Sequence, residues 1–210
     1  MNNINKKDGF ENAVDAAFSI QDIEFQILER IDLLTSEHKS QFAKTICLSL
    51  EEKLQKYRSI FSENHKLFPY TMSISDLGTH NMLYAKDSFS FIDFEFFGRD
   101  SVDKMVGDFL LHPRNSFEQN EIVRFKESIS NKLGWQSENL GFILPILSLK
   151  WAAIAFKREL TELKISSSNE SIKLFSYTSN GLKYLEYFEY LISGESVDSV
   201  STFNLFTAKI

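Results

Sequence analysis

The chain has 210 residues, a length that suits one large domain or two small ones, and 43% of them are hydrophobic. Its formal net charge is −6. Because nucleic-acid-binding proteins normally carry a basic face, this balance argues against DNA or RNA as a partner. A single cysteine, Cys47, cannot form an internal disulfide, which favours a cytoplasmic location, and its apolar neighbours predict a buried thiol.

Hydrophobic residues recur at helical spacing over the first third of the chain. The pattern predicts one helix over about 10–34, with Val14 and Phe18 on its apolar face, and a second helix over 36–61. The residues before Asp15 are polar and lack the apolar stretch of a secretory signal.

The middle of the chain changes to strand-like segments. Residues 68–74 predict one strand, and 82–84 and 89–92 predict a hairpin closed by a short turn at 85–87. The aromatic run alternates around strand positions, which predicts packing in the core instead of a stacking surface. Its members are Phe89, Phe91, Phe94, Phe96 and Phe97.

Helical patterns return from Val102 onward, and the His112-Pro113 pair ends the first of these helices. Further helices are predicted over 117–133, 140–163 and 171–192, with a serine-rich linker at 165–171. The most apolar stretch, 141–156, contains Pro145 and Lys150 and is shorter than the roughly 20 residues of a membrane span, so we expect a buried helix.

The predicted fold class is therefore mainly α with a small central β-hairpin region (α+β). We expect one domain over 1–195, followed by a tail over 196–210 with weak periodicity. Within the apolar helix, core packing is the expected role of Lys150 and Trp151.

The chemistry-bearing residues lie around the predicted hairpin. A short polar loop runs from Ser75 through Asp76 to Asn81, and Asp93 follows the hairpin in the segment Ile92-Asp93-Phe94-Glu95. Phosphoryl transfer from ATP needs one carboxylate to orient the attacking hydroxyl, and an amide oxygen with a second carboxylate to hold magnesium. Magnesium uses few protein oxygens, and an Asp, an Asn five residues later and a following Asp supply these groups.

The two segments resemble motifs of aminoglycoside phosphotransferases and choline kinases. That family carries His-Gly-Asp-x-x-x-x-Asn and then Ile-Asp-Phe/Trp-Glu/Gly, although Ile74 and Ser75 stand here in the places of the His and the Gly. An Asp and an Asn at this spacing are also common turn residues, but their joint match with 92–95 is much rarer.

The resemblance implies the C-terminal catalytic lobe of a protein-kinase-like fold. In that lobe Asp76 would be the catalytic base, and Asn81 and Asp93 would hold Mg²⁺. ATP would be the co-substrate, and the acceptor would be a small-molecule hydroxyl on an aminoglycoside, an amino alcohol or a sugar. Supporting or substrate-side roles are implied for Glu95, His80 and Asp108.

Other polar residues near the motif allow simpler interpretations. No Cys or second His lies at ligand spacing from His80, so we expect it to brace the loop. Asp100 and Asp103 are expected to cap a helix or to be solvated, and Asp108 is the best structural candidate among the acids of this region.

A complete kinase also needs a β-rich nucleotide-binding lobe with a Gly-rich turn and a strand Lys. Before Asp76 the sequence has one glycine, Gly9, and two helical patterns, so we expect a truncated or free-standing lobe that is inactive or weak alone. A separate nucleotide-binding lobe or self-association would then cover exposed apolar strands at 68–72 and 89–91. The alternative is a non-catalytic remnant or binding module with the same fold.

Overall fold

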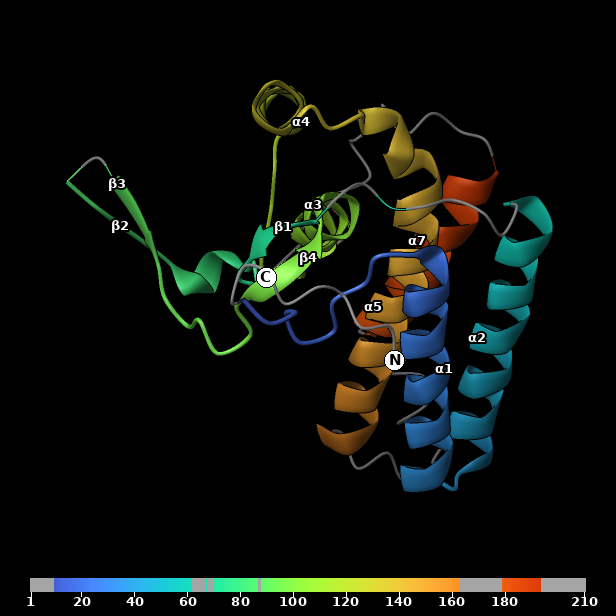
Figure 1. Cartoon of the computed structure of the whole chain (residues 1–210). Helices are drawn as coiled ribbons and strands as arrows, with labels where there is room; N and C mark the ends of the chain where they lie inside the picture. Colours follow the sequence, from blue (N-terminus) through green and yellow to red (C-terminus); the bar gives the residue numbers. More distant parts are fainter. Residues whose placement is uncertain (1–9, 62–66, 68–69, 87, 163–178, 194–210) are drawn as a thin grey trace.

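The computed structural model describes residues 10–61, 67, 70–86, 88–162 and 179–193. Over these residues the protein is mainly α-helical with two small antiparallel sheets, which confirms the predicted fold class at this level. Four helices pack together on one side of the molecule (Figure 1): α1 (Ile20–Glu37), α2 (Gln41–Ile60), α5 (Leu140–Glu162) and α7 (Asn180–Ile192). The predicted linker at 165–171 and the tail at 196–210 lie outside the described residues.

The first two helices begin later than predicted. Helix α1 starts at Ile20 because Ser19 Oγ accepts the backbone N–H of Asp22 at 3.1 Å and caps the helix. The preceding residues instead form backbone hydrogen bonds with Arg99, so Val14 is exposed and not on a helical face. Helix α2 likewise starts after its cap, Ser40, while the apolar spacing inside both helices is as expected.

Two short sheets lie beside the helices. Strand β1 (Tyr70–Ser73) pairs antiparallel with β4 (Gly98–Ser101), and β2 (Met82–Ala85) pairs antiparallel with β3 (Ser88–Phe91). The β2–β3 hairpin is the predicted one. Strand β4 escapes prediction because Gly-Arg-Asp-Ser has no apolar alternation, and Gly98 is needed there because a Cβ would lie 2.4 Å from Ala13 N.

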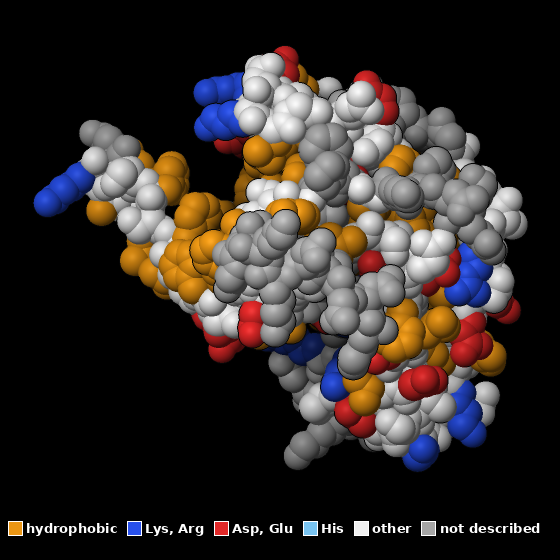
Figure 2. Space-filling model, viewed as in Figure 1, with side chains coloured by type: hydrophobic (Ala, Val, Ile, Leu, Met, Phe, Trp, Pro, Cys, Tyr) orange, Lys and Arg blue, Asp and Glu red, His pale blue; other side chains and the backbone are white. Residues whose placement is uncertain are grey.

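The prediction that the aromatic run packs in the core is wrong. Phe89 is 68% exposed and Phe94 54%, and Phe91 and Phe97 are also exposed. The hairpin projects away from the helices (Figure 1), and its hydrophobic side chains are visible on the arm at the left of Figure 2. A two-stranded ribbon of four residues a side buries an apolar face only against another layer, and no described element provides one.

Helix α5 forms the centre of the core. Ile143, Leu144 and Leu147 are fully buried, and α1, α2, α3 (Val102–Leu111) and α7 all pack against it. Among the described residues it is the one helix whose length and composition would also suit a membrane span, and 67% of its most apolar window is buried inside the protein. This burial is what the sequence predicted.

The helices predicted after Val102 and over 117–133 are close to their expected bounds, whereas the first part of the helix predicted over 171–192 lies outside the described residues, and α7 begins at Asn180. Helix α3 begins at Val102 and ends before His112, and α4 (Gln119–Leu133) ends at Gly134 in the left-handed conformation, with φ 66°. Cys47 is buried in the core as predicted.

Candidate functional site

Asp76 lies in a loop that leaves β1 and is shaped by local hydrogen bonds. Ser75, immediately before it, has φ 60°, a left-handed conformation that residues with a side chain adopt infrequently and that clusters at functional sites. The Ser75 N–H donates to Ser73 Oγ at 3.0 Å, and the Gly78 N–H approaches Asp76 Oδ1 at 3.4 Å. The backbone is thus fixed on both sides of the carboxylate.

Asn115 attaches this loop to the end of α3. Its Oδ1 accepts the Thr79 N–H at 2.8 Å, and its Nδ2 donates to the carbonyls of Leu77 at 3.0 Å and Phe109 at 2.7 Å. All of these groups belong to the loop or to α3 and the turn after it. These hydrogen bonds hold the loop against the end of α3.

His112, the residue that ends α3, orients the Asp76 carboxylate. Its Nε2 lies 3.1 Å from Asp76 Oδ1, and its Nδ1 accepts the backbone N–H of Arg114 at 3.1 Å. Because Nδ1 is an acceptor, the ring proton of the neutral form is on Nε2 and points at the carboxylate. Burial lowers the pKa of His112, with Asp76 opposing that effect, so the ring is kept neutral.

The second imidazole near Asp76 belongs to His80. Its Nε2 lies 3.5 Å from Asp76 Oδ2, and its ring stacks on that of His112 with centroids 5.4 Å apart. Gly78 makes room for both rings, since a Cβ at this position would lie 2.3 Å from His80 Nδ1 and 2.4 Å from His112 Cε1. The bracing role expected of His80 fits this contact.

Asp76, His80 and His112 together form a donor set that a transition metal could use. Their ligand atoms all lie within 4.8 Å of one another. A metal bound at Nε2 of a neutral imidazole, however, needs the ring proton on Nδ1, and at His112 that atom faces the N–H of Arg114. In this conformation His112 is hydrogen-bonded to Asp76 and His80 stacks on His112, so the three residues are not arranged as a prepared metal site.

The two residues expected to hold magnesium, Asn81 and Asp93, lie on adjacent backbone. Asn81 is buried, and its side-chain Nδ2 donates to the backbone carbonyl of Asp76 at 3.2 Å. The backbone carbonyl of Asn81 accepts the Ile92 N–H at 2.9 Å. Asp93, the residue after Ile92, is exposed and has φ 64°. Glu95 is also exposed. Neither Asn81, Asp93 nor Glu95 lines the cavity that contains Asp76.

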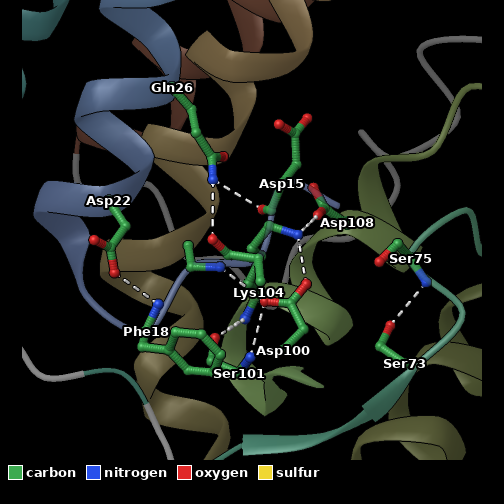
Figure 3. A network of polar contacts seen from close by, with 12 residues as sticks. Asp15, Phe18, Asp22, Gln26, Ser73, Ser75, Asp100, Ser101, Lys104 and Asp108 are labelled. Atoms are coloured by element: carbon green, nitrogen blue, oxygen red, sulfur yellow. Dashed lines mark hydrogen bonds and ion pairs between the residues drawn. The ribbon is translucent and has the colours of Figure 1, made fainter. Parts of the chain in front are cut away.

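A buried charge network joins β4 and α3 (Figure 3). Lys104 Nζ contacts Asp100 Oδ2 at 2.6 Å and Asp108 Oδ2 at 2.8 Å. From α5, Trp151 Nε1 donates to Asp108 Oδ1 at 2.9 Å. Burial alone would raise the pKa of Asp108, but Lys104 and Lys150 hold it below its usual range, whereas burial raises the pKa of Asp100. Asp108 is thus held by residues of α3 and α5, and its expected role in supporting the loop stays a prediction.

Two expectations about nearby acids are wrong. Asp100 and Asp103 are fully buried, so neither is solvated, and the residue that caps α3 is Ser101. Asp103 accepts hydrogen bonds from Trp135 Nε1 at 2.7 Å and Asn139 Nδ2 at 3.0 Å. Both acids stabilise the positions of neighbouring segments.

A cavity of about 840 Å³ opens beside Asp76. Its walls come from the Asp76 loop, the end of α3, the second half of α5 and the start of α7. Lys150 and Trp151, expected to pack in the core, are buried and half-buried respectively, but both line this cavity. The lining includes Ser75, Asp76, His80, Phe96, Lys104, Asp108, His112, Lys150, Trp151, Arg158, Glu159, Asn180 and Tyr184.

Sequence reasoning misses His112 and Lys150 as residues of this site. The sequence marks His112 as the end of a helix, which it is, but its pairing with Asp76 depends on how the loop folds back over α3. A charged residue within the otherwise apolar segment 141–156 is the available signal for Lys150, because lysines are almost never fully buried without a reason.

Known proteins provide no likeness from which a role for this cavity could be transferred. Comparison of the chain with protein-family models, with curated proteins and with solved structures gives no match. A function for the cavity must therefore follow from its own residues.

Proposed function

We propose that this chain is the catalytic lobe of a kinase-like, ATP-dependent phosphotransferase that acts on the hydroxyl of a small molecule held in the cavity. The observation that supports this most directly is a chain of contacts at the cavity mouth. Asp76 lines the cavity, Asn81 donates to the Asp76 carbonyl, and the next link leads through Ile92 to Asp93. An acceptor and a metal-bound phosphate would then meet on either side of one loop.

In the proposed step Asp76 accepts the proton of the acceptor hydroxyl. The hydroxyl oxygen forms a bond to the γ-phosphorus while the bond from that phosphorus to the β–γ bridging oxygen breaks, releasing ADP. His112 donates to Oδ1 and so keeps the carboxylate from rotating. Holding the base in place is useful because this kind of catalysis depends mainly on positioning.

The donor chemistry of Asn81 and Asp93 fits a hard divalent cation. An amide and a carboxylate from adjacent backbone offer the oxygen ligands that Mg²⁺ prefers, and the exposure of Asp93 leaves room for phosphate oxygens and water. When bound, the ion would neutralise charge on the nucleotide phosphates. The left-handed backbone at Asp93, φ 64°, is the sort of conformation that functional loops retain despite its energetic cost.

The exposed hairpin fits the partner that the proposal requires. Leu83, Tyr84, Phe89 and Phe91 are all more than 40% exposed, and apolar patches of this kind mark interaction sites. A nucleotide-binding lobe, supplied as a separate chain or by association, would cover this ribbon and bring ATP to Asp93.

The test is acceptor-dependent release of ADP by the protein isolated together with its natural partners. A panel of aminoglycosides, choline, sugars, glycerate and glycerol phosphate with Mg-ATP is expected to yield at least one substrate, and Asp76→Asn is expected to abolish turnover while the circular dichroism spectrum is unchanged. Equal turnover in the variant would remove Asp76 from the mechanism. Binding of a panel compound in the cavity without any ADP release would favour the non-catalytic binding module.

A further inference from the structure

The carboxylates that line the cavity are already engaged by the protein. Asp76 faces His112, and Asp108 is bound by Lys104 and Trp151. The other two are held as follows: Asp15 forms an ion pair with Arg30, and Glu159 accepts hydrogen bonds of 2.6 Å from both Ser179 Oγ and the Asn180 N–H. A cationic acceptor would have to compete with these contacts for a counter-charge.

Lys150 is a cavity-lining cation that is buried but only weakly paired with a carboxylate. Its side chain is 4% exposed, and its nearest carboxylate oxygen, Asp108 Oδ2, is 3.8 Å away, beyond hydrogen-bond distance. The same oxygen lies 2.8 Å from Lys104 Nζ. Within the part of the chain that the structure describes, the Lys150 ammonium therefore makes no hydrogen bond.

A buried ammonium without hydrogen bonds lowers the stability of a fold compared with an apolar side chain of the same length. Its three donors are satisfied when an anion occupies the space in front of it. Ser75 Oγ, next to Asp76 on the cavity wall, is also buried and has no partner among the described residues. On the cavity wall, Ser75 Oγ thus lacks a hydrogen-bond partner and the Lys150 ammonium has only the long contact with Asp108, so a bound molecule could supply contacts to both.

We propose that the acceptor carries an anionic group, a carboxylate or a phosphate, which Lys150 binds inside the cavity while the hydroxyl lies at Asp76. The inference rests on the proposed function, since it names the substrate class for the same site. Trp151, Phe96 and Tyr184 line the rest of the cavity and provide apolar surface for a carbon skeleton.

The electrostatic surroundings of Lys150 agree with this role. Burial lowers its pKa to about 8; Asp108 and Asp15 favour the charged form, whereas Lys104 and Arg30 oppose it. The ammonium is consequently charged at neutral pH and ready to pair with an anion. Anion binding is expected to weaken as the pH rises above about 8, because the free protein then loses the proton from Lys150.

The experiment is calorimetric titration of the full chain, without ATP, with four matched compounds: glycerol, glycerate, glycerol phosphate and choline. Wild type is compared with Lys150→Met and with Lys157→Met, which removes a partly exposed lysine of the same helix that does not line this cavity. Melting curves establish that each variant is folded. Because Lys→Met keeps the apolar stem, the packing of α5 is expected to be preserved.

Glycerate or glycerol phosphate should bind wild type and Lys157→Met equally, and Lys150→Met about tenfold or more weakly, because a charge-assisted contact is lost. The anion that shows the larger difference identifies the group as carboxylate or phosphate. Equal binding of both anions to all three proteins, or tighter binding of choline than of either anion, would overturn the proposal.

The same variants separate this inference from the proposed function. Anion binding that depends on Lys150 but never leads to ADP release would leave the inference standing and the phosphotransferase proposal wrong. Turnover of a neutral or cationic acceptor that is unaffected by Lys150→Met would support the phosphotransferase proposal and show that the inference about an anionic acceptor is wrong.

Discussion

The two ring nitrogens of His112 make separate contacts, and together they decide how Asp76 is presented. One is fixed by the N–H of Arg114 and the other faces the carboxylate, while Trp151 packs edge-on against the ring with centroids 5.3 Å apart. A side chain held on three sides in this way has one orientation and one tautomer. Its titration should therefore be visible in the stability of the fold.

We expect wild type to lose more stability than His112→Gln when the pH falls from about 7.5 to about 5.5. The pKa of His112 is lowered in the folded protein, so below 6.5 the unfolded chain binds a proton that the folded chain does not. Its contribution is thus present above pH 6.5 and is lost as the pH falls through the folded-state pKa. Gln retains a donor toward Asp76 but does not titrate. Urea unfolding at both pH values measures the difference, with His38→Gln as control; identical pH dependence in both proteins would contradict the prediction.

Lys150→Met should raise the free energy of unfolding at pH 7 by roughly 1–3 kcal/mol, because a poorly paired buried charge is replaced by an apolar group. The pKa of Lys150 is lowered from 10.5 to about 8, so between these values the unfolded chain binds the extra proton and wild-type stability rises with pH. The gap between the two proteins should accordingly narrow toward pH 10. A variant less stable than wild type at neutral pH would show that Lys150 is structurally required.

For individual site residues, the sequence identifies those with motif spacing and misses those that only folding brings together. Asp76, Asn81 and Asp93 form a recognisable pattern along the chain. His112 and Lys150 lie 36 and 74 positions after Asp76, which no local pattern connects. Their contacts depend on α3 and α5 packing side by side beneath the loop.

Helices α5 and α7 approach each other closely because Gly181 has no side chain. A Cβ there would lie 2.4 Å from the ring of Phe156, which is fully buried. The same arrangement recurs where α3 meets α5, since a Cβ at Gly107 would lie 2.4 Å from Leu147 Cδ1. Two of the cavity walls are thus set by glycine contacts between helices.

Gly181→Ala should destabilise the protein by about 1–3 kcal/mol through overpacking of the interface between α5 and α7. Gly141→Ala is the matched control: Gly141 lies in α5, a Cβ added to it would have no neighbour within 4 Å, and the variant should gain up to about 1 kcal/mol from the higher helix propensity of Ala. Denaturant unfolding compares the two. The prediction fails if both substitutions change stability in the same direction by similar amounts.

Elements with strong local signals are predictable from the sequence. Helices α3, α4 and α5 combine apolar periodicity with a clear start or stop, and their bounds agree to within about two residues. The start of α1 and the existence of β4 could not be predicted from the sequence, because residues 10–17 pair with β4 through tertiary contacts. Helical spacing in that segment is overridden by this pairing.

Large apolar side chains are exposed on the helical body and on the hairpin arm, and the arm carries the two most exposed of those described, Phe89 and Tyr84 (Figure 2). A ribbon that projects with Tyr84 and Phe89 more than 60% exposed has surface that water solvates poorly. Under the proposed function this is where the nucleotide-binding lobe would be accommodated.

We expect the purified 210-residue chain to transfer no phosphate at a useful rate and to self-associate as its concentration rises. The described residues before Asp76 contain no β-rich lobe to hold ATP, and the hairpin exposes apolar surface. Light scattering of wild type and of Phe89→Ser, with Val123→Ser on exposed α4 as control, measures the association. Micromolar ATP binding with turnover by the wild-type monomer would contradict the expected lack of phosphate transfer. Equal association of all three proteins would contradict self-association through the hairpin.

The last described helix, α7, supplies Asn180 and Tyr184 to the cavity wall, and the Tyr184 hydroxyl donates to the Leu111 carbonyl at 2.6 Å. During translation the loop, α3 and α5 are all made before this wall exists. At about 5–20 residues per second, the ribosome reaches the end of α7 some seconds after the end of α5. A nascent chain that has released only residues up to 162 thus lacks one wall of the pocket beside Asp76, Lys150 and Trp151, and that wall is added only when α7 docks.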